Sequence, residues 1–180
     1  GAQIPWRAVH IVQVDERVAP AGHPDRNLTH IRESLADAPL PPDQLYPMPV
    51  ESPELEAAAG SYAATLRKMA GELPVIDLVH LGLGPDGHTA SLVPSDPVLD
   101  IDNADVALSG QYQGRRRMTL TYPILNRARR ILWVVTGGDK EGMVNRLLNA
   151  DRGIPAGRVS SEHALLLADS AAAGRRTNKA

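Results

Sequence analysis

Short apolar runs rich in β-branched residues alternate along the chain with segments whose apolar residues recur at helical spacing. The apolar runs predict strands at 9–14, 76–81, 105–109, 118–121, 131–135 and 164–167. The helical spacing predicts helices at 27–35, 53–70 and 140–148. The run at 76–81 has almost no polar residue, as expected when helices cover both faces of a sheet. This alternation predicts an α/β fold with a largely parallel sheet flanked by helices.

Residues that start and stop helices support these boundaries. Asn27 stands at the N-cap position of the first helix, and Ser52 with Pro53 occupies the cap and first-turn positions of the second. Gly71 follows the last apolar residue of the second helix. The segment 39–53 between the two helices is rich in proline and predicts an irregular connection.

Composition places the chain among globular proteins. Its 180 residues, 43% hydrophobic and 22% charged, predict a single domain spanning 1–180. The net charge of -2, with no basic run beyond 115–117, argues against nucleic acid or an anionic membrane as a partner. No stretch reaches the roughly 20 apolar residues that cross a bilayer. The absence of cysteine excludes disulfides and thiolate metal sites, and we expect a cytoplasmic location.

Two predicted strands end in ionisable clusters. Asp15, Glu16 and Arg17 follow the first strand, and Asp86 and His88 follow the second. Because the carboxyl ends of parallel strands share one edge of a sheet, the two clusters are expected to meet at one cleft. Each also has a plainer interpretation, a solvated loop for the charged triplet and a loop or cap residue for the histidine.

The glycines at 82, 84 and 87 formally match the fingerprint of a dinucleotide-binding loop. That interpretation requires a long helix beginning at the last glycine, but Pro94 interrupts the following segment, and the Asp86 carboxylate would face the diphosphate. The alternative is that Gly84 and Gly87 let the backbone turn sharply beside a ligand, leaving His88 at the mouth of the cleft.

The residue types at this edge suit ester hydrolysis. Histidine can take a proton from water near neutral pH, and Asp86 could fix the tautomer of His88 or stabilise its charged form. Hydrolysis also needs a positive group for the oxyanion of the tetrahedral intermediate, and Arg17 is the candidate.

Two further cations are candidates for binding an anion. Lys140 follows the strand at 131–135 and lies in the first turn of the predicted helix, where backbone amides favour an anion. Arg117 begins the segment that leads into the strand at 118–121. The alternatives are an ordinary surface lysine for Lys140 and a solvated basic loop for Arg117, which follows Arg115 and Arg116.

These motifs together resemble the 6-phosphogluconolactonases, the lactonase branch of the glucosamine-6-phosphate isomerase and deaminase superfamily. The matching pieces are Asp15-Glu16-Arg17-Val18, Asn27, residues 82–92, Arg117-Met118-Thr119, residues 137–140 and residues 154–169. They occur in the family's order over nearly the whole chain, and the glycine-histidine stretch at 82–92 is the most specific of them.

The resemblance implies a Rossmann-like three-layer fold and hydrolysis of 6-phosphogluconolactone to 6-phosphogluconate in the pentose phosphate pathway. It implies His88 as general base, Asp15 and Arg17 as an essential pair, and Asp86 as a supporting carboxylate. The residues implied in substrate or phosphate binding are Arg117, Lys140, Gly84, Gly87 and Asn27. The implied partner is a small phosphorylated sugar lactone, with no metal and no organic cofactor.

Three alternatives stay open. Deaminases of the superfamily typically continue the glycine-histidine loop into a phenylalanine, an asparagine and a glutamate, whereas this chain continues with residues 91–94, Ser-Leu-Val-Pro. They also usually carry a tyrosine where Arg17 stands, so the lactonase form is preferred. A non-catalytic sugar-phosphate sensor would need a DNA-binding segment, for which the chain has no basic face. The third alternative is a truncated pseudoenzyme.

The resemblance also predicts that an N-terminal strand-helix unit with a Ser-Gly-Gly phosphate loop is missing. The first predicted strand already leads to Asp15, and Arg26 replaces a serine that commonly precedes the asparagine. A chain without that unit is expected to bind phosphate weakly. It would also expose apolar surface and a strand edge, which predicts self-association.

Overall fold

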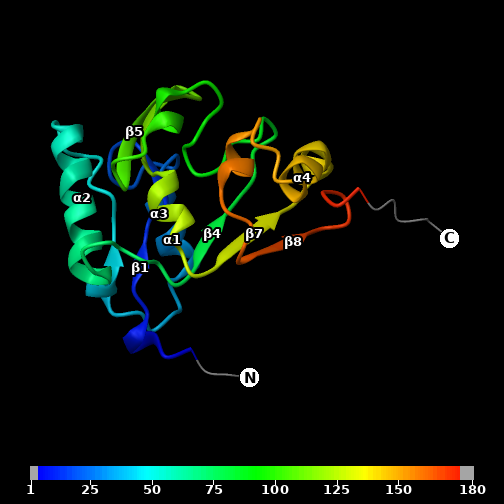
Figure 1. Ribbon diagram of the computed structural model, residues 1–180. Coiled ribbons are helices and arrows are strands. Elements are labelled where there is room, and N and C mark those ends of the chain that lie inside the picture. The colour runs from blue at the N-terminus through cyan, green and yellow to red at the C-terminus, as the bar shows by residue number, and fades with distance from the viewer. Residues whose placement is uncertain (1–3, 175–180) are drawn as a thin grey trace.

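The structure is a computed structural model that describes residues 4–174 (Figure 1). One parallel sheet contains three strands, β4 (Val79–Leu81), β7 (Ile131–Val135) and β8 (Ala164–Ala168), in the order β4-β7-β8. A second parallel pair joins β1 (Ile11–Val12) to β3 (Leu45–Tyr46). The predicted α/β class with parallel strands flanked by helices is therefore confirmed.

The sequence did not predict a three-stranded antiparallel sheet, which has the order β2-β6-β5. It contains β2 (Asp15–Arg17), β5 (Val106–Tyr112) and β6 (Arg115–Leu120). The charged triplet is thus a strand paired with β6, not a loop that ends a strand. Arg117 lies inside β6 with only 3% of its surface exposed, so the solvated basic loop is also wrong for this residue.

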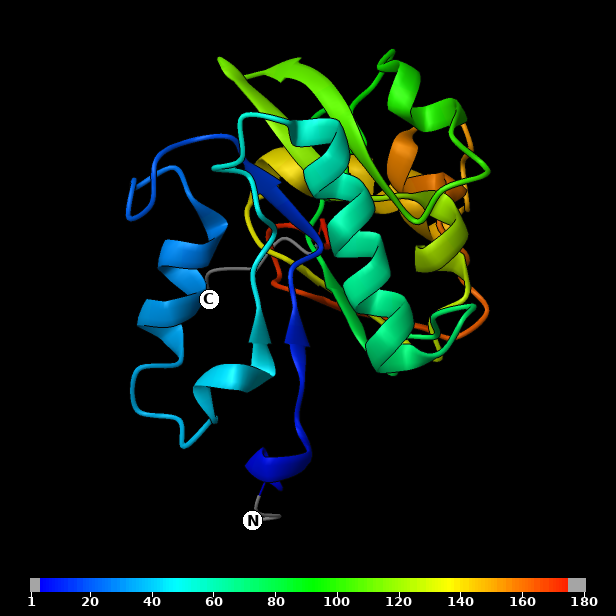
Figure 2. The same ribbon diagram turned by 90° about the vertical axis from the view of Figure 1, so that its left-hand side faces the viewer.

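Among residues 4–174, four α-helices flank the sheets: α1 (Asn27–Ser34), α2 (Leu55–Ala70), α3 (Tyr122–Asn126) and α4 (Glu141–Leu148). The long helix α2 packs against β5, as Figure 2 shows, and it ends at Gly71, which has a positive φ of 91°. The short helix α3 was not predicted. Lys140 belongs to a 3₁₀ turn, Gly138–Lys140, that precedes α4. It is therefore the N-cap residue of α4, one position before the first turn in which the sequence predicted it.

The start of α1 differs from the predicted cap. Arg26, not Asn27, is the N-cap residue, and its side chain makes no capping hydrogen bond. The carboxylate of Glu16 instead accepts the backbone N–H groups of Asn27 and Leu28, at 2.8 and 2.9 Å. A carboxylate at this end of a helix accepts hydrogen bonds from the free backbone amides and interacts favourably with the positive end of the helix dipole. The side chain of Asn27 is thereby free to bind Asp15.

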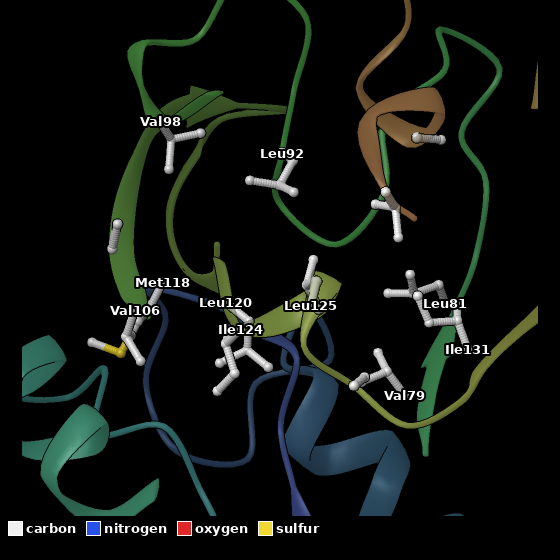
Figure 3. Close-up of a cluster of buried hydrophobic side chains, with 14 of the residues drawn as sticks. Val79, Leu81, Leu92, Val98, Val106, Met118, Leu120, Ile124, Leu125 and Ile131 are labelled. Carbon is white, nitrogen blue, oxygen red and sulfur yellow. The ribbon is translucent and has the colours of Figure 1, made fainter. Parts of the chain in front are cut away.

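One hydrophobic core joins the parallel and antiparallel sheets (Figure 3). It includes Val79, Leu81 and Ile131 from the parallel sheet, Val106, Met118 and Leu120 from the antiparallel sheet, and Ile124 and Leu125 from α3. Because these side chains are almost completely buried, the two sheets pack as one unit. This packing fixes the loop after β4 relative to β2 and β6.

The other face of the β4-β7-β8 sheet carries exposed apolar side chains. Val134 pairs with Leu167 in register, and Leu132 pairs with Leu165. Leu165 and Leu167 expose 59% and 51% of their surfaces, and Val134 exposes 39%. The expectation that helices cover both faces of this sheet is therefore wrong for the described residues, whereas the predicted exposure of apolar surface is present. No helix among residues 4–174 is long and apolar enough to span a membrane.

Candidate active site

The loop after β4 turns back on itself and places His88 over its own glycines. The N–H of Gly84 donates to the carbonyl of His88 at 2.8 Å, and the N–H of Gly87 donates to the carbonyl of Gly84 at 3.0 Å. A Cβ on Gly84 would lie 2.0 Å from Nδ1 of His88, so only glycine leaves room for the imidazole. Gly87 has a φ of +83°, which also favours glycine.

This loop is not followed by the helix that a dinucleotide site requires. Residues 89–92 form a tight turn closed by a bridge between Thr89 and Leu92. No helical N-terminus is therefore aimed at a pyrophosphate from Gly87. The fold thus agrees with the second interpretation of the glycines, in which they allow close packing around His88.

His88 is held by a carboxylate and a phenol. Its Nδ1 lies 2.6 Å from Oδ1 of Asp86, and the hydroxyl of Tyr112 donates to Oδ2 of Asp86 at 3.0 Å. Burial opposes ionisation of Asp86, but the hydrogen bonds and charge of His88 outweigh it and lower the pKa of Asp86. The carboxylate is therefore ionised at neutral pH and accepts the Nδ1 proton of His88. This tautomer leaves the lone pair on Nε2, and no protein group among the described residues hydrogen-bonds that atom.

A cavity of about 380 Å³ opens beside His88 and brings most of the predicted site residues together. Its lining includes seven of the predicted residues: Asp15, Arg17, Asn27, Gly84, His88, Arg117 and Lys140. Asp86 and Gly87 are not in the lining, and Asp86 acts from behind His88. The convergence of the two clusters at one cleft is thus observed.

The expected reason for this convergence was wrong. The two clusters do not follow neighbouring strands of one parallel sheet, because β2 pairs with β6 and β4 pairs with β7. They are joined instead by Ser91, whose Oγ donates to Oδ2 of Asp15 at 2.7 Å. The Nδ2 group of Asn27 donates to Oδ1 of Asp15 at 3.0 Å. Burial raises the pKa of Asp15, although Ser91 and Arg17 oppose the rise.

Two guanidinium groups face the cavity without a carboxylate ion pair among the described residues. Arg17 donates through Nη1 to the carbonyl of Asp25, and Arg117 donates through Nη2 to Oε1 of Gln113 at 3.1 Å. The Nε atoms of both arginines are buried and have no hydrogen-bond partner in the part of the chain that the structure describes. Burial and the charge of Arg17 lower the pKa of Arg117, whereas Asp15 and Tyr112 oppose this. A buried cation such as Arg117 that lacks a carboxylate partner favours an anionic ligand.

Lys140 adds a third positive charge to the cavity wall. Its Nζ contacts Oδ2 of Asp139 at 2.8 Å, and Asp139 is largely exposed to solvent. Such an exposed ion pair is weak, so an incoming anion can compete with Asp139 for the ammonium group. Among residues 4–174, no cluster of three His, Cys, Asp or Glu side chains could hold a metal ion.

Tyr112, Gln113 and His80 were not predicted as site residues from the sequence. Gln113 and His80 line the cavity, and Tyr112 supports His88 and Arg117 from the side. The only local signal for Tyr112 and Gln113 is the Gln113-Gly114 turn between two strands. Ser91 lay within the recognised glycine-histidine stretch, but its bond to Asp15 depends on tertiary packing.

Together these features define an α/β protein with a cation-lined cavity for a small anion and a carboxylate-paired histidine at its wall. A family model described as glucosamine-6-phosphate isomerases/6-phosphogluconolactonase matches residues 1–167. The chain belongs to this family.

Relatives named as lactonases share a large part of the chain. It is 36% identical over 143 residues to a 6-phosphogluconolactonase of Synechocystis sp., covering 77% of the chain and 59% of the relative. It is 38% identical over 142 residues to the human 6-phosphogluconolactonase, covering 74% and 54%. A crystal structure of 6-phosphogluconolactonase from Thermotoga maritima superposes with a TM-score of 0.81 at 26% identity, covering 93% of this chain and 75% of that one. The chain thus spans somewhat more than half the length of these two curated relatives.

Proposed function

We propose that this chain hydrolyses 6-phosphogluconolactone to 6-phosphogluconate, a reaction of the pentose phosphate pathway. The observation that carries the proposal is the cavity itself, which is lined by His88 and by two guanidinium groups that have no carboxylate ion pair among residues 4–174. The names of the curated relatives support the lactonase branch over the isomerase branch of the family. A cytoplasmic location and a small phosphorylated lactone as the only ligand are parts of the same proposal.

His88 acts as the general base in this mechanism. Nε2 takes a proton from a water molecule, and the resulting hydroxide attacks the carbonyl carbon of the lactone. The imidazolium that forms is stabilised by the ionised Asp86, 2.6 Å from Nδ1. When the ester C–O bond of the ring breaks, the same imidazolium returns its proton to the leaving ring oxygen. The products are the open-chain acid and the restored imidazole.

The arginines and the lysine divide the negative charges of the substrate between them. Arg17 stabilises the oxyanion of the tetrahedral intermediate, because its side chain lines the cavity with His88 and has no carboxylate ion pair among residues 4–174. Arg117 and Lys140 bind the phosphate, and Asn27 orients Asp15 beside Arg17. Gly84 and Gly87 supply the tight backbone that presents His88.

The test is the rate of 6-phosphogluconolactone hydrolysis above the spontaneous rate, for the parent chain and for His88→Ala. We expect the substitution to lower kcat by about 10²- to 10⁴-fold, which is the usual contribution of general acid–base catalysis. A matched control is His80→Ala, because His80 lines the same cavity but has no carboxylate partner among the described residues. The control should keep most of the activity.

Two results would count against the proposal. A folded parent chain with no activity above the spontaneous rate would reject the lactonase function of this chain. Equal rates for the parent and His88→Ala, or a large loss in His80→Ala alone, would reject His88 as the base. Unphosphorylated gluconolactone as substrate tests the role of the cations, since a much lower kcat/KM is expected without the phosphate.

A further inference from the structure

Tyr112 lies between the two parts of the proposed active site. It is the last residue of β5, and its hydroxyl donates to Oδ2 of Asp86 at 3.0 Å. Its ring meets the imidazole of His88 edge to face, with the ring centroids 5.1 Å apart. The guanidinium carbon of Arg117 lies 4.9 Å from the centroid of the same ring. One side chain therefore contacts both the proposed base, His88, and a residue proposed to bind the phosphate, Arg117.

The hydroxyl of Tyr112 fixes the orientation of Asp86. Oδ1 of Asp86 binds Nδ1 of His88, and it also accepts the backbone N–H of His88 at 3.2 Å. Oδ2 accepts the hydroxyl of Tyr112, so both oxygens of the carboxylate are held. The Asp86 side chain is 35% exposed, so without the hydroxyl it could rotate towards water. Burial and the bond to Asp86 raise the pKa of Tyr112, which keeps the hydroxyl protonated as a donor.

The ring of Tyr112 positions Arg117 by a different contact. Arg117 has no carboxylate partner among the described residues, and a cation over an aromatic face is attracted by the electrons of the ring. The carbonyl of Tyr112 and Oε1 of Gln113 accept from Nη2 of Arg117, at 3.4 and 3.1 Å. These three contacts direct the guanidinium along the cavity wall.

The hairpin between β5 and β6 explains why one residue can reach both groups. Gln113 and Gly114 have φ values of 51° and 77°, as in the tight two-residue turns that join antiparallel strands. Tyr112 pairs with Arg115 across this turn, and Arg117 is two residues further along β6 on the same face. Tyr112 and Arg117 are thus diagonal neighbours on adjacent strands, and long side chains at such positions are close enough to make contact.

We propose that Tyr112 is a positioning residue with two separable roles, its hydroxyl orienting the Asp86–His88 pair and its ring orienting Arg117 towards the phosphate. The inference rests on the proposed lactonase function for its kinetic consequences. The two roles belong to different atoms of one side chain, so two substitutions can separate them.

The kinetic test compares Tyr112→Phe with Tyr112→Leu. The phenylalanine keeps the ring and should lower kcat about 10-fold, a part of the general-base contribution, with KM within about twofold of the parent. The leucine lacks ring and hydroxyl, so it should lower kcat similarly and raise KM about 5-fold or more through the lost cation–π contact. The matched control is Tyr122→Phe, which removes a hydroxyl that donates to the carbonyl of Pro155 at 2.9 Å. It should change neither constant.

Two measurements without turnover distinguish this inference from the proposed function. The ¹⁵N chemical shifts of the His88 imidazole should show one tautomer in the parent and a mixture in Tyr112→Phe. Titration with inorganic phosphate should show a weaker affinity in Tyr112→Leu than in the parent, and an unchanged affinity in Tyr112→Phe. If the parent lacks lactonase activity but these differences occur, the proposed function fails and the positioning roles stand.

The inference is overturned by any of three results. Tyr112→Phe could retain the parental kcat and a single His88 tautomer, which would remove the role of the hydroxyl. Tyr112→Leu could bind phosphate as tightly as the parent does, which would remove the role of the ring. Tyr122→Phe could reproduce the losses of Tyr112→Phe, which would make them a general effect on stability.

Discussion

Replacing Glu16 by glutamine is expected to destabilise the fold strongly. The carboxylate of Glu16 is completely buried, and Oε1 accepts the backbone N–H groups of Arg17 and Asn27, both at 2.8 Å. Oε2 accepts Nε2 of Gln13 and the N–H of Leu28, both at 2.9 Å. Nε of Arg26 lies 3.0 Å from Oε2 in an ion pair, although its N–H is not aligned for a hydrogen bond.

The expected magnitude follows from this count of donors. Glutamine has nearly the same shape, but its NH₂ group faces at least two donors whichever way the amide turns. The substitution also leaves Arg26 with one remaining carboxylate, that of Glu51. Breaking a buried ion pair on one side costs about 3–5 kcal/mol. For a chain of this size, that loss corresponds to a fall in Tm of about 6–20 °C.

The pH dependence supplies a second test with a definite sign. Burial opposes the ionisation of Glu16, but hydrogen bonds from Gln13 and Leu28, with the contact to Arg26, outweigh it and lower the pKa of Glu16 below its ordinary 4.5. A lowered pKa in the folded state adds stability that is present above 4.5 and is lost as the pH falls through the folded value. The stability difference between the parent and Glu16→Gln should therefore shrink below pH 4.5.

Urea unfolding, followed by the fluorescence of the buried Trp133, measures both effects. The matched control is Glu56→Gln, because Glu56 forms an exposed ion pair with Arg116 at 3.4 Å. The control should cost less than about 1 kcal/mol, as surface pairs usually do. A Glu16→Gln protein within about 1 kcal/mol of the parent at pH 7 would refute the reasoning, and so would a difference that does not change with pH.

Two further predictions concern the loop and the exposed sheet face. Gly84→Ala places a Cβ 2.0 Å from Nδ1 of His88 and should lower lactonase kcat about 100-fold or more. The control is Gly82→Ala, whose Cβ would have no atom within 4 Å and which should keep the parental kcat. Equal rates for the two variants would contradict the prediction. The apolar face around Leu165 and Leu167 should cause self-association, seen by light scattering as a concentration-dependent mass above 19.3 kDa. Leu165→Glu should return the chain to the monomer mass and Leu148→Glu on α4 should not, while a parent that stays monomeric at high concentration would exclude the self-association.

The sequence predicted the elements whose signal is local. Helix α2 has its apolar stripe at 3.6-residue spacing and a glycine at its end, so propensity and packing agree, and its predicted bounds were close to Leu55–Ala70. The strand at 131–135 matched β7 for the same reason, because a short apolar run between turns has few other structures available. The antiparallel sheet was missed because nothing local to Asp15–Arg17 reveals its pairing with β6.

Contacts within the candidate site were predictable where the two residues lie close together in sequence. Asp86 and His88 are two residues apart on a glycine turn, and the structure places them in hydrogen-bond contact. The environment of Glu16 depends on Gln13 and Arg26 together, and the contact of Tyr112 with Asp86 spans 26 residues. Contacts of that kind are set by the packing of β5 and β2 on β6, which the periodicity of apolar residues does not encode.

Arg17 and Arg117 differ from Arg26 and Arg127 in whether a carboxylate of the fold pairs with them. Arg26 and Arg127 are paired with carboxylates at 2.6 and 2.5 Å, so their charges are neutralised within the fold. Arg17 and Arg117 have buried Nε atoms and no carboxylate ion pair among residues 4–174. Leaving a buried guanidinium unpaired costs free energy, and a ligand anion can offset that cost by binding both. Two positive charges that no carboxylate among residues 4–174 pairs with therefore lie on the wall of the cavity that His88 also lines.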